Sequence, residues 1–355
     1  MKNLKLFDKI YEKLFNDYHF KVVYPKEFDI NNIFLDMDRD NIEEKKVDGV
    51  GTFCLIKETD IPYLLYVPQE VEKTDRLIME VNNCESDDKK KFLLQGVDTI
   101  KKNFSFINHP VPILVPLIPT EKGKPYYQQI SKDGFEEHID LKVDKIIDHA
   151  LDKIEEISGV RMDDKIFLNG YSSSAVFAQR FCLLHPERVD TAVIGGASGS
   201  IPSLDKSIDY PLGIRDISNF NMDAYKNIKF KYYVGEYELI DLSNNRRDVI
   251  DGKIVTVSKP MHDMTYFQRS IDPIVGKAYR DKYGEEYFDR TNNVVRTYKE
   301  NGIDINSTVI RGRTHSRMEI DGKLYKGTTE GIGEIIDSAY RKSILGLRRE
   351  ESLKR

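Results

Sequence analysis

Residues 166–175, with the sequence Ile-Phe-Leu-Asn-Gly-Tyr-Ser-Ser-Ser-Ala, decide the fold of this chain. The apolar residues at 166–168 predict a buried strand, and the apolar residues at 175–184 predict a helix that follows it at once. The intervening residues 170–174 match the pattern G-x-S-x-G, except that the last position holds a serine. In that pattern the small residues let the strand and the helix approach each other, and the central serine occupies a strained turn. The alternative interpretation is a serine-rich helix cap, since serine favours that position generally.

Short β-rich runs and longer runs at helical spacing alternate along the rest of the chain. This alternation predicts an α/β fold with a mostly parallel central sheet and helices on both faces. The further predicted strands are 50–57, 63–67, 77–81, 111–117, 191–194, 230–234 and 305–310, and the further predicted helices are 87–103, 139–154 (ended by Gly159) and 332–345. Two looser segments, at about 200–227 and 242–301, predict insertions that form a cap over one edge of the sheet.

The first 48 residues are expected to form an N-terminal extension, and residues 49–355 the α/β domain. Apolar residues at helical spacing predict an amphipathic helix within residues 1–20. The stretch that follows, up to Lys46, is polar and irregular in pattern. Residues 36–40 resemble a calcium loop only superficially, because the glycine and the distal glutamate of such a loop are missing. The extension could pack on the core or mediate a homo-oligomer.

The composition is that of a soluble globular protein, since 40% of the 355 residues are hydrophobic and 32% are charged. The 54 basic and 59 acidic residues are mixed along the chain, which leaves no basic stripe for a nucleic-acid partner. No apolar run approaches the length of a membrane span or the pattern of a signal peptide. Three cysteines without C-x-x-C spacing argue against a disulfide framework and a zinc site. We therefore expect a cytoplasmic protein without a metal site.

A serine hydroxyl is a weak nucleophile unless a neighbouring base takes its proton and a carboxylate orients that base. For Ser172 the predicted base is His315, in a loop after the strand at 305–310. Another histidine, His262, lies in the second predicted insertion. A third, His185, lies at the end of the helix that follows Ser172, where we expect a structural role.

The carboxylate should follow the serine and precede the histidine in the chain, as it does when a strained serine turn of this kind carries a triad. Three carboxylates follow the predicted strand at 230–234. Loops at the carboxyl ends of parallel strands carry the site in open α/β sheets, so any of the three could reach the base. Glu238 is the first choice, Asp241 is close behind, and Glu236 is third.

The oxyanion that develops during acyl transfer needs two hydrogen-bond donors fixed before the reaction. One is expected to be the backbone amide of Ser173, directly after the nucleophile. The other is expected in the loop after the strand at 77–81, where Asn83 is assigned as the donor and Asn82 as a substrate contact. Cys84 lies in the same loop but lacks the strand-turn-helix context of a nucleophile, so we expect it to be an ordinary small residue. The aromatic residues that are candidates to line an acyl pocket are Tyr126, Tyr127, Tyr171, Tyr225, Tyr237, Tyr266 and Phe267. The alternative is that most of them are packing residues, and no more than half are expected to contact substrate.

Several phrases of the sequence together resemble the α/β-hydrolase superfamily. They are Gly170-Tyr171-Ser172-Ser173-Ser174, Leu184-His185-Pro186-Glu187-Arg188-Val189, Gly195-Gly196-Ala197, Glu80-Val81-Asn82-Asn83 and Tyr233-Val234-Gly235-Glu236. Within that superfamily the chain is similar to bacterial esterase-like and polyhydroxybutyrate-depolymerase-like hydrolases, over roughly 49–345. The resemblance implies a catalytic triad of Ser172, Glu238 or Asp241, and His315, with an acyl-enzyme intermediate and no cofactor. Glu stands where Asp is commoner at the acid, and Ser174 replaces the last motif glycine.

Two functions from different classes follow from these observations. The first is a serine hydrolase, a carboxylesterase that cleaves a small or medium acyl ester; a peptidase or a thioesterase would use the same chemistry. The second is a hydrolase-fold protein that has lost catalysis and serves as a binding or scaffold module. Dinucleotide binding at residues 195–199 is disfavoured, because the spacing is not G-x-G-x-x-G.

Overall fold

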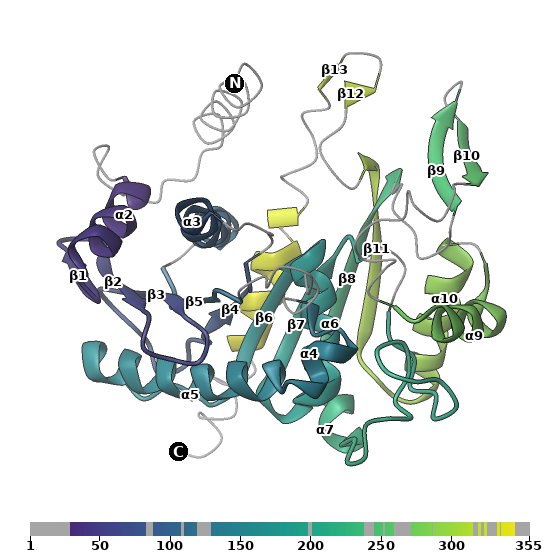
Figure 1. Cartoon of the computed structure of the whole chain (residues 1–355), viewed down its shortest axis with the longest axis horizontal. Coiled ribbons are helices and arrows are strands. Elements are labelled where there is room, and N and C mark those ends of the chain that lie inside the picture. Colours follow the sequence, from purple (N-terminus) through teal and green to yellow (C-terminus); the bar gives the residue numbers. More distant parts are fainter. Residues whose placement is uncertain are drawn as a thin grey trace.

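The structure is a computed structural model, and the residues that it describes are 29–82, 88–107, 110–118, 129–197, 201–237, 245–250, 253–258, 271–285, 287–314, 319–320, 323–324, 332–333 and 335–344. Within these ranges a nine-stranded sheet runs in the order β1-β2-β3-β5-β4-β6-β7-β8-β11 (Figure 1). Its strands are β1 (Glu44–Val47), β2 (Gly51–Ile56), β3 (Tyr63–Pro68), β4 (Ile78–Met79), β5 (Ile113–Pro116), β6 (Ile166–Tyr171), β7 (Val189–Gly195), β8 (Lys229–Tyr237) and β11 (Ile305–Thr314). Two small hairpins add β9 (Asn245–Ile250) with β10 (Lys253–Ser258), and β12 (Glu319–Ile320) with β13 (Lys323–Leu324).

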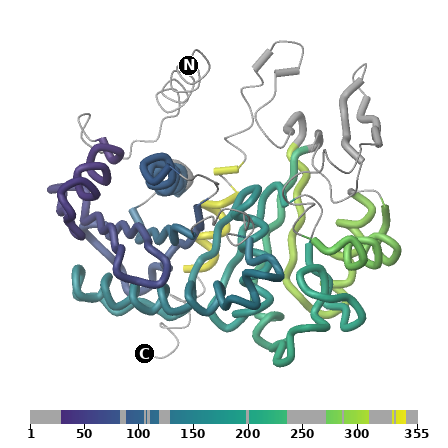
Figure 2. The backbone as a smooth tube through the Cα atoms, viewed as in Figure 1, coloured from purple at the N-terminus to yellow at the C-terminus, as the bar shows by residue number. Residues whose placement is uncertain are grey.

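The sheet has an antiparallel part and a parallel part. The pairs β1/β2, β2/β3 and β3/β5 are antiparallel, whereas every neighbouring pair from β5 to β11 is parallel. Figure 2 shows the chain passing from the purple antiparallel edge, through the teal central strands, to the green helices beyond β11. The prediction of a mostly parallel sheet is confirmed.

Helices cover both faces of the sheet, as predicted. They are α2 (Ile30–Asp40), α3 (Lys89–Phe106), α4 (Lys132–Glu136), α5 (Ile139–Ser158), α6 (Ser173–Leu184), α7 (Met222–Lys226), α9 (Pro273–Tyr283), α10 (Tyr287–Glu300) and a C-terminal helix described at 332–333 and 335–344. Successive strand residues point to opposite faces, so each strand contributes to two cores. In β6, Ile166 and Leu168 pack with α5 and α6, whereas Phe167 packs with α3 and the C-terminal helix. No helix in the described ranges has the length and apolarity needed to cross a bilayer.

The order of the central strands creates a topological switch point, at which open α/β sheets generally form a crevice. From β4 the chain moves to β5 on one side, and from β5 it moves back across β4 to β6 on the other side. The connections that leave β4 and β6 lead to α3 and α6, which lie on opposite faces. Ligands bind at such a switch point, outside the carboxyl ends of the two strands. The segments that begin at Glu80 and at Ser172 flank this crevice.

The structure of residues 30–47 differs from the predicted irregular extension. Residues 30–40 form α2, and its buried side chains Ile30, Ile33, Phe34 and Met37 have the spacing of an amphipathic helix. Charged residues at 36–40 obscure this spacing in the sequence, and they are helical instead of part of a loop. Strand β1 then pairs with β2. The sheet therefore begins before residue 49, and the predicted helix within 1–20 lies outside the described residues.

The predicted cap is only partly a separate element. Residues 201–226 connect β7 to β8, and their apolar residues join the core shared by α5 and α6. Helices α9 and α10 precede β11 and pack in the same core. These segments therefore occupy crossover positions, because a parallel strand pair needs a connection that returns to the other end of the sheet. The β9–β10 hairpin is an addition to this pattern, and its role as a cap stays a prediction.

A charged cluster around the buried Asp190 joins the C-terminal helix to the amino-terminal end of β7. We call it the Asp190 cluster, and its members are Arg76, Asp163, Asp190, Lys229 and Ser343. Asp190 Oδ1 lies 3.3 Å from Arg76 Nη2 and 3.1 Å from Lys229 Nζ, and Asp190 Oδ2 accepts a 2.7 Å hydrogen bond from Ser343. Burial by itself raises the pKa of Asp190, but the charge of Arg76 and these hydrogen bonds outweigh it and lower the pKa below its usual value.

Candidate active site

Ser172 occupies a strained turn between β6 and α6. Its backbone angles are φ 62° and ψ −116°, a region in which non-glycine residues pay about 1–3 kcal/mol. The turn is held from both sides, because the Ser172 amide donates to Gly195 O (2.9 Å) and the Ser172 carbonyl accepts from the Val176 amide (3.2 Å). The side chain makes no capping hydrogen bond to the helix. The helix-cap interpretation is therefore wrong, since a capping residue has extended backbone angles and binds the first turn.

Small residues on either side of Ser172 allow this turn. A Cβ atom on Gly170 would lie 2.5 Å from Ser174 O and 2.7 Å from Ala175 N, which are closer than real Cβ contacts. Ser174, which replaces the last glycine of the pattern, is buried and its hydroxyl accepts from the Tyr171 amide at 2.9 Å. The serine therefore fits the space and ties the end of the strand to the start of the helix.

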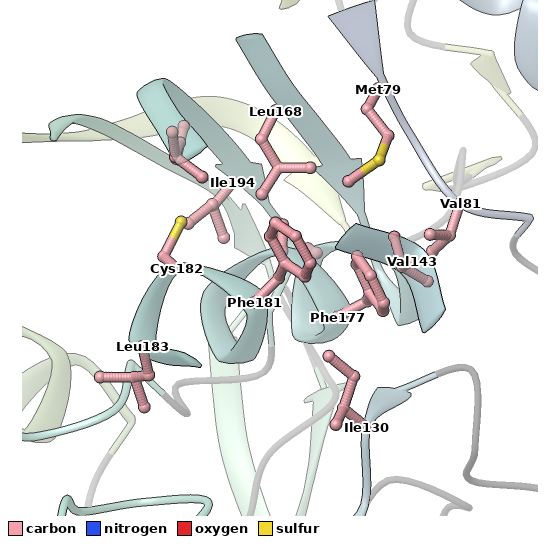
Figure 3. Close-up of a cluster of buried hydrophobic side chains, with 14 of the residues drawn as sticks. Met79, Val81, Ile130, Val143, Leu168, Phe177, Phe181, Cys182, Leu183 and Ile194 are labelled. Atoms are coloured by element: carbon pink, nitrogen blue, oxygen red, sulfur yellow. The ribbon is translucent and has the colours of Figure 1, made fainter. Parts of the chain in front are cut away.

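The helix that carries the turn is fixed by packing along its whole length. Phe177 and Phe181 of α6 lie stacked below the strands, near Leu168 and Met79 (Figure 3). At its far end His185 is buried, and His185 Nε2 lies 2.9 Å from Asp140 Oδ2 of α5. His185 therefore has the structural role predicted for it. The backbone amides of its first turn, starting at Ser173, lie directly after the serine turn.

The carboxyl ends of β8 and β11 meet at the same edge of the sheet. The two strands run parallel, and their last paired residues are Tyr237 and Thr314. Glu238 follows the first of these directly and His315 follows the second. Both strands extend beyond the level of Ser172, because Tyr171 lies in register with Gly195, and Gly195 with Tyr233. The described ends of β8 and β11 thus lie at the edge of the sheet on which Ser172 lies.

The strand order and the turn at Ser172 together decide the fold. This is the α/β-hydrolase fold. Its strained serine turn follows the central strand β6, and its crevice lies between the connections that leave β4 and β6. The predicted fold class is therefore confirmed.

Comparisons with known proteins find similarity in the path of the backbone, among solved structures. No protein-family model and no curated protein matches the chain. Among solved structures it is similar to poly(aspartic acid) hydrolase-1 from Sphingomonas sp. KT-1, with 15% identity, a TM-score of 0.49 and coverage of 76% of this chain and 94% of that chain. It is also similar to LpqC, a poly(3-hydroxybutyrate) depolymerase from Bordetella parapertussis, with 12% identity, a TM-score of 0.48 and coverage of 80% and 88%. With values this low, the fold assignment depends on the strand order and on the turn.

Two of the predicted pocket residues have other roles in this α/β-hydrolase fold. Asn82 is buried, its Oδ1 accepts from the Ile118 amide at 2.9 Å, and its Nδ2 lies 3.4 Å from Ile118 O. Because its amide binds backbone, Asn82 holds the crevice loop instead of contacting substrate. Tyr225 of α7 is also buried, and its hydroxyl lies 2.7 Å from that of Tyr298. It is a core residue.

The structure describes some of the other predicted residues fully, one only in its backbone, and the rest not at all. Tyr171 is half-buried at the end of β6 and stacks on Tyr233 with ring centroids 6.0 Å apart. Tyr237 is placed through its backbone alone. The predicted residues outside the described ranges are Asn83, Cys84, Tyr126, Tyr127, Glu238, Asp241, His262, Tyr266, Phe267 and His315. Their assignments stay predictions. Among the described residues, no group of three or more His, Cys, Asp or Glu side chains could hold a metal ion.

The structure also brings Gln129 to the turn, a residue that the sequence does not single out. Gln129 Nε2 donates to Ser173 Oγ at 2.8 Å, and its Oε1 is buried without a hydrogen-bond partner. Its carbonyl accepts from the guanidinium of Arg180 at 2.9 Å, and burial lowers the pKa of Arg180 to about 10. No local pattern marks Gln129, because the contact joins residues 44 positions apart.

Proposed function

We propose that this protein is a serine hydrolase that cleaves a small or medium carboxylic ester through a triad of Ser172, a carboxylate after β8, and His315. The observation that carries the proposal is the strained backbone of Ser172 at the carboxyl end of a central parallel strand. Strain of this size persists only where the surrounding structure imposes it, and it clusters at functional sites. A turn that only connected a strand to a helix would not need it.

The oxyanion donors support the same chemistry. The amide of Ser173 begins α6, at the positive end of the helix dipole. We assign the second donor to Asn83, which follows the described residues 80–82 after β4. Two donors that are fixed before the reaction stabilise the charge that develops on a carbonyl oxygen.

The proposed reaction then proceeds in two steps, the acylation of Ser172 and its deacylation by water. Ser172 Oγ attacks the ester carbonyl carbon while His315 accepts its proton, and the tetrahedral intermediate places its oxyanion at the two donors. The intermediate expels the alcohol, which takes the proton from His315, and an acyl-serine remains. Water attacks this acyl group with His315 as the base, and the acid leaves as Ser172 Oγ regains a proton. Glu238, or Asp241, orients the imidazole and stabilises its charged form.

A series of p-nitrophenyl esters of increasing acyl length tests the proposal. Ser172→Ala should abolish hydrolysis while circular dichroism and the melting temperature show a folded protein. His315→Ala should lower kcat by orders of magnitude, whereas the matched control His262→Ala should leave it within about twofold. Hydrolysis that survives in Ser172→Ala would refute the proposed nucleophile.

Two carboxylate-to-amide substitutions identify the acid of the triad. Glu238→Gln and Asp241→Asn each remove one negative charge from the segment after β8, and the true acid should show the larger loss of kcat. Glu236→Gln, within the last residues of β8, serves as the third arm, and equal small losses in all three would contradict an acid at or just after the end of β8. Matched amide and thioester substrates separate an esterase from a peptidase or a thioesterase. A folded wild type that is inert toward all of them would favour the non-catalytic binding module.

A further inference from the structure

A fully buried carboxylate lies beside the serine turn without being part of the triad. Glu80 follows β4 directly, and its side chain is 0% exposed. Its amide donates to Leu114 O of β5 at 3.2 Å, so its backbone continues the sheet. Burying a carboxylate is costly unless hydrogen bonds and an opposite charge compensate. The residues that supply this compensation show what Glu80 holds in place.

Four side-chain donors converge on the two oxygens of Glu80. Oε2 accepts from Asn103 and from Asn169, each at 2.9 Å. Oε1 accepts from Ser174 at 3.0 Å and forms an ion pair with Lys102. These donors come from three elements, because two of them lie on α3, one lies on β6 and one lies on α6. We name the five residues the Glu80 clamp.

The clamp holds the serine turn on both sides. Asn169 lies three residues before Ser172, and Ser174 lies two residues after it. The hydroxyl of Ser174 also lies 3.0 Å from Tyr171 O, so that the turn and the carboxylate share one donor. Asn169 Nδ2 is also 2.9 Å from Asn103 Oδ1, which links β6 to α3 directly. The position of the turn relative to β4 is therefore set by side-chain hydrogen bonds as well as by the sheet.

The same carboxylate fixes the other side of the crevice. Glu80 begins the segment that continues through Asn82 into the loop assigned to the second oxyanion donor. Asn82 is anchored to Ile118, two residues after β5, so residues 80–82 are held at both ends. The serine turn and the described residues 80–82 after β4 are thus both tied to Glu80.

We infer that Glu80 is a positioning residue that holds the serine turn and residues 80–82 after β4 at the separation which oxyanion stabilisation requires. The inference rests on the proposed serine-hydrolase function. Glu80 acts through Ser174 and Asn169, since its own side chain is fully buried. A carboxylate suits this task because it only accepts hydrogen bonds, and four donors face it. Glutamine has nearly the same shape but would point an NH₂ group at one or more of those donors.

The test compares Glu80→Gln with Asp190→Asn. Both remove the charge of a buried, hydrogen-bonded carboxylate, and Asp190 lies at the opposite end of the sheet, where β7 begins. Both variants should unfold at lower temperature. Glu80→Gln alone should lower kcat on a p-nitrophenyl ester by about 100-fold, the effect of a misplaced oxyanion donor, with KM within about twofold. Ser174→Ala, which removes one donor of the clamp, should lower kcat in the same direction by less.

Hydrogen exchange provides a readout that needs no activity. Amides of residues 170–176 should exchange faster in Glu80→Gln than in wild type, and they should be unchanged in Asp190→Asn. Equal losses of kcat in the two variants, or equal exchange at the turn, would overturn the inference. If wild type has no hydrolysis that depends on Ser172, the proposed function fails and the exchange comparison still decides the role of Glu80. If Glu80→Gln does not fold, unchanged kcat and unchanged exchange in Ser174→Ala would overturn the inference.

Discussion

Replacing Gly170 by alanine should displace the serine turn. The added Cβ would lie 2.5 Å from Ser174 O, with Ala175 N and Ser174 C each at 2.7 Å. All three atoms belong to the backbone, so no side chain can rotate away. Real Cβ atoms essentially never come closer than 3.0 Å to such an atom, so Ser174 O must move away by at least 0.5 Å. It must move by 0.9 Å to reach the 3.4 Å of an ordinary contact. Ser172 lies between the strand and the atoms that must move.

A shift approaching 1 Å at a reacting group costs about 100-fold in rate, which corresponds to about 2.7 kcal/mol in the activation barrier. Overpacking should also lower the free energy of unfolding by about 1–3 kcal/mol. The assay is kcat on a p-nitrophenyl ester together with urea unfolding. Gly159→Ala is the control, because Gly159 ends α5 at φ 74° with no atom within 4 Å of the added Cβ. It should cost about 1 kcal/mol of stability and leave kcat unchanged. Full activity in Gly170→Ala would refute the steric account of the turn.

Three further predictions concern stability and reactivity. Ser172→Gly should abolish activity and raise the free energy of unfolding by about 1 kcal/mol, because glycine adopts φ 62° without strain; a loss of stability in urea unfolding would contradict strain at Ser172. Asp190→Asn should lower the free energy of unfolding by about 3–5 kcal/mol at pH 7. Because the pKa of Asp190 is lowered on folding, its contribution is complete above its unfolded pKa of about 4 and is lost as pH falls through its lowered folded pKa, so the variant should show a flatter acid limb of unfolding free energy against pH. Burial raises the pKa of Cys54 to about 12 and also raises that of Cys182, so in a Cys84→Ser background Ellman's reagent should modify neither thiol before denaturation and both afterwards; rapid reaction of the native protein would contradict their burial.

The local parts of the fold are readable from the sequence because each depends on neighbouring residues. The strand β6, the turn at Ser172 and the helix α6 follow from one run of ten residues. The end of α5 follows from Gly159, which takes the left-handed conformation that the sequence suggests. The helix α2 also has apolar residues at helical spacing, but the charged residues between them make the pattern hard to recognise in the sequence. The spacing of apolar residues and the turn-forming residues between the runs therefore predict the strands and helices and much of their order.

The parts that the sequence does not give are contacts between distant residues. The Glu80 clamp joins residues up to 94 positions apart, and its local sign is one carboxylate in the otherwise apolar run at 77–81. The contact between Gln129 and Ser173 has no local sign at all. The choice among Glu238, Asp241 and Glu236 fails for the same reason, because all three lie within a few residues of the end of one strand. Only the position of the base relative to each carboxylate separates them.

Chemical labelling of Ser172 tests the central claim most directly. Purified wild type and Ser172→Ala are treated with a fluorophosphonate, and intact mass and peptide mapping locate the adduct. An activated serine should give one adduct per chain, on the peptide that contains Ser172, and none in the variant. A folded wild type that takes up no adduct, or one that is labelled equally in the Ser172→Ala variant, would contradict the assignment of Ser172 as the nucleophile of a serine hydrolase.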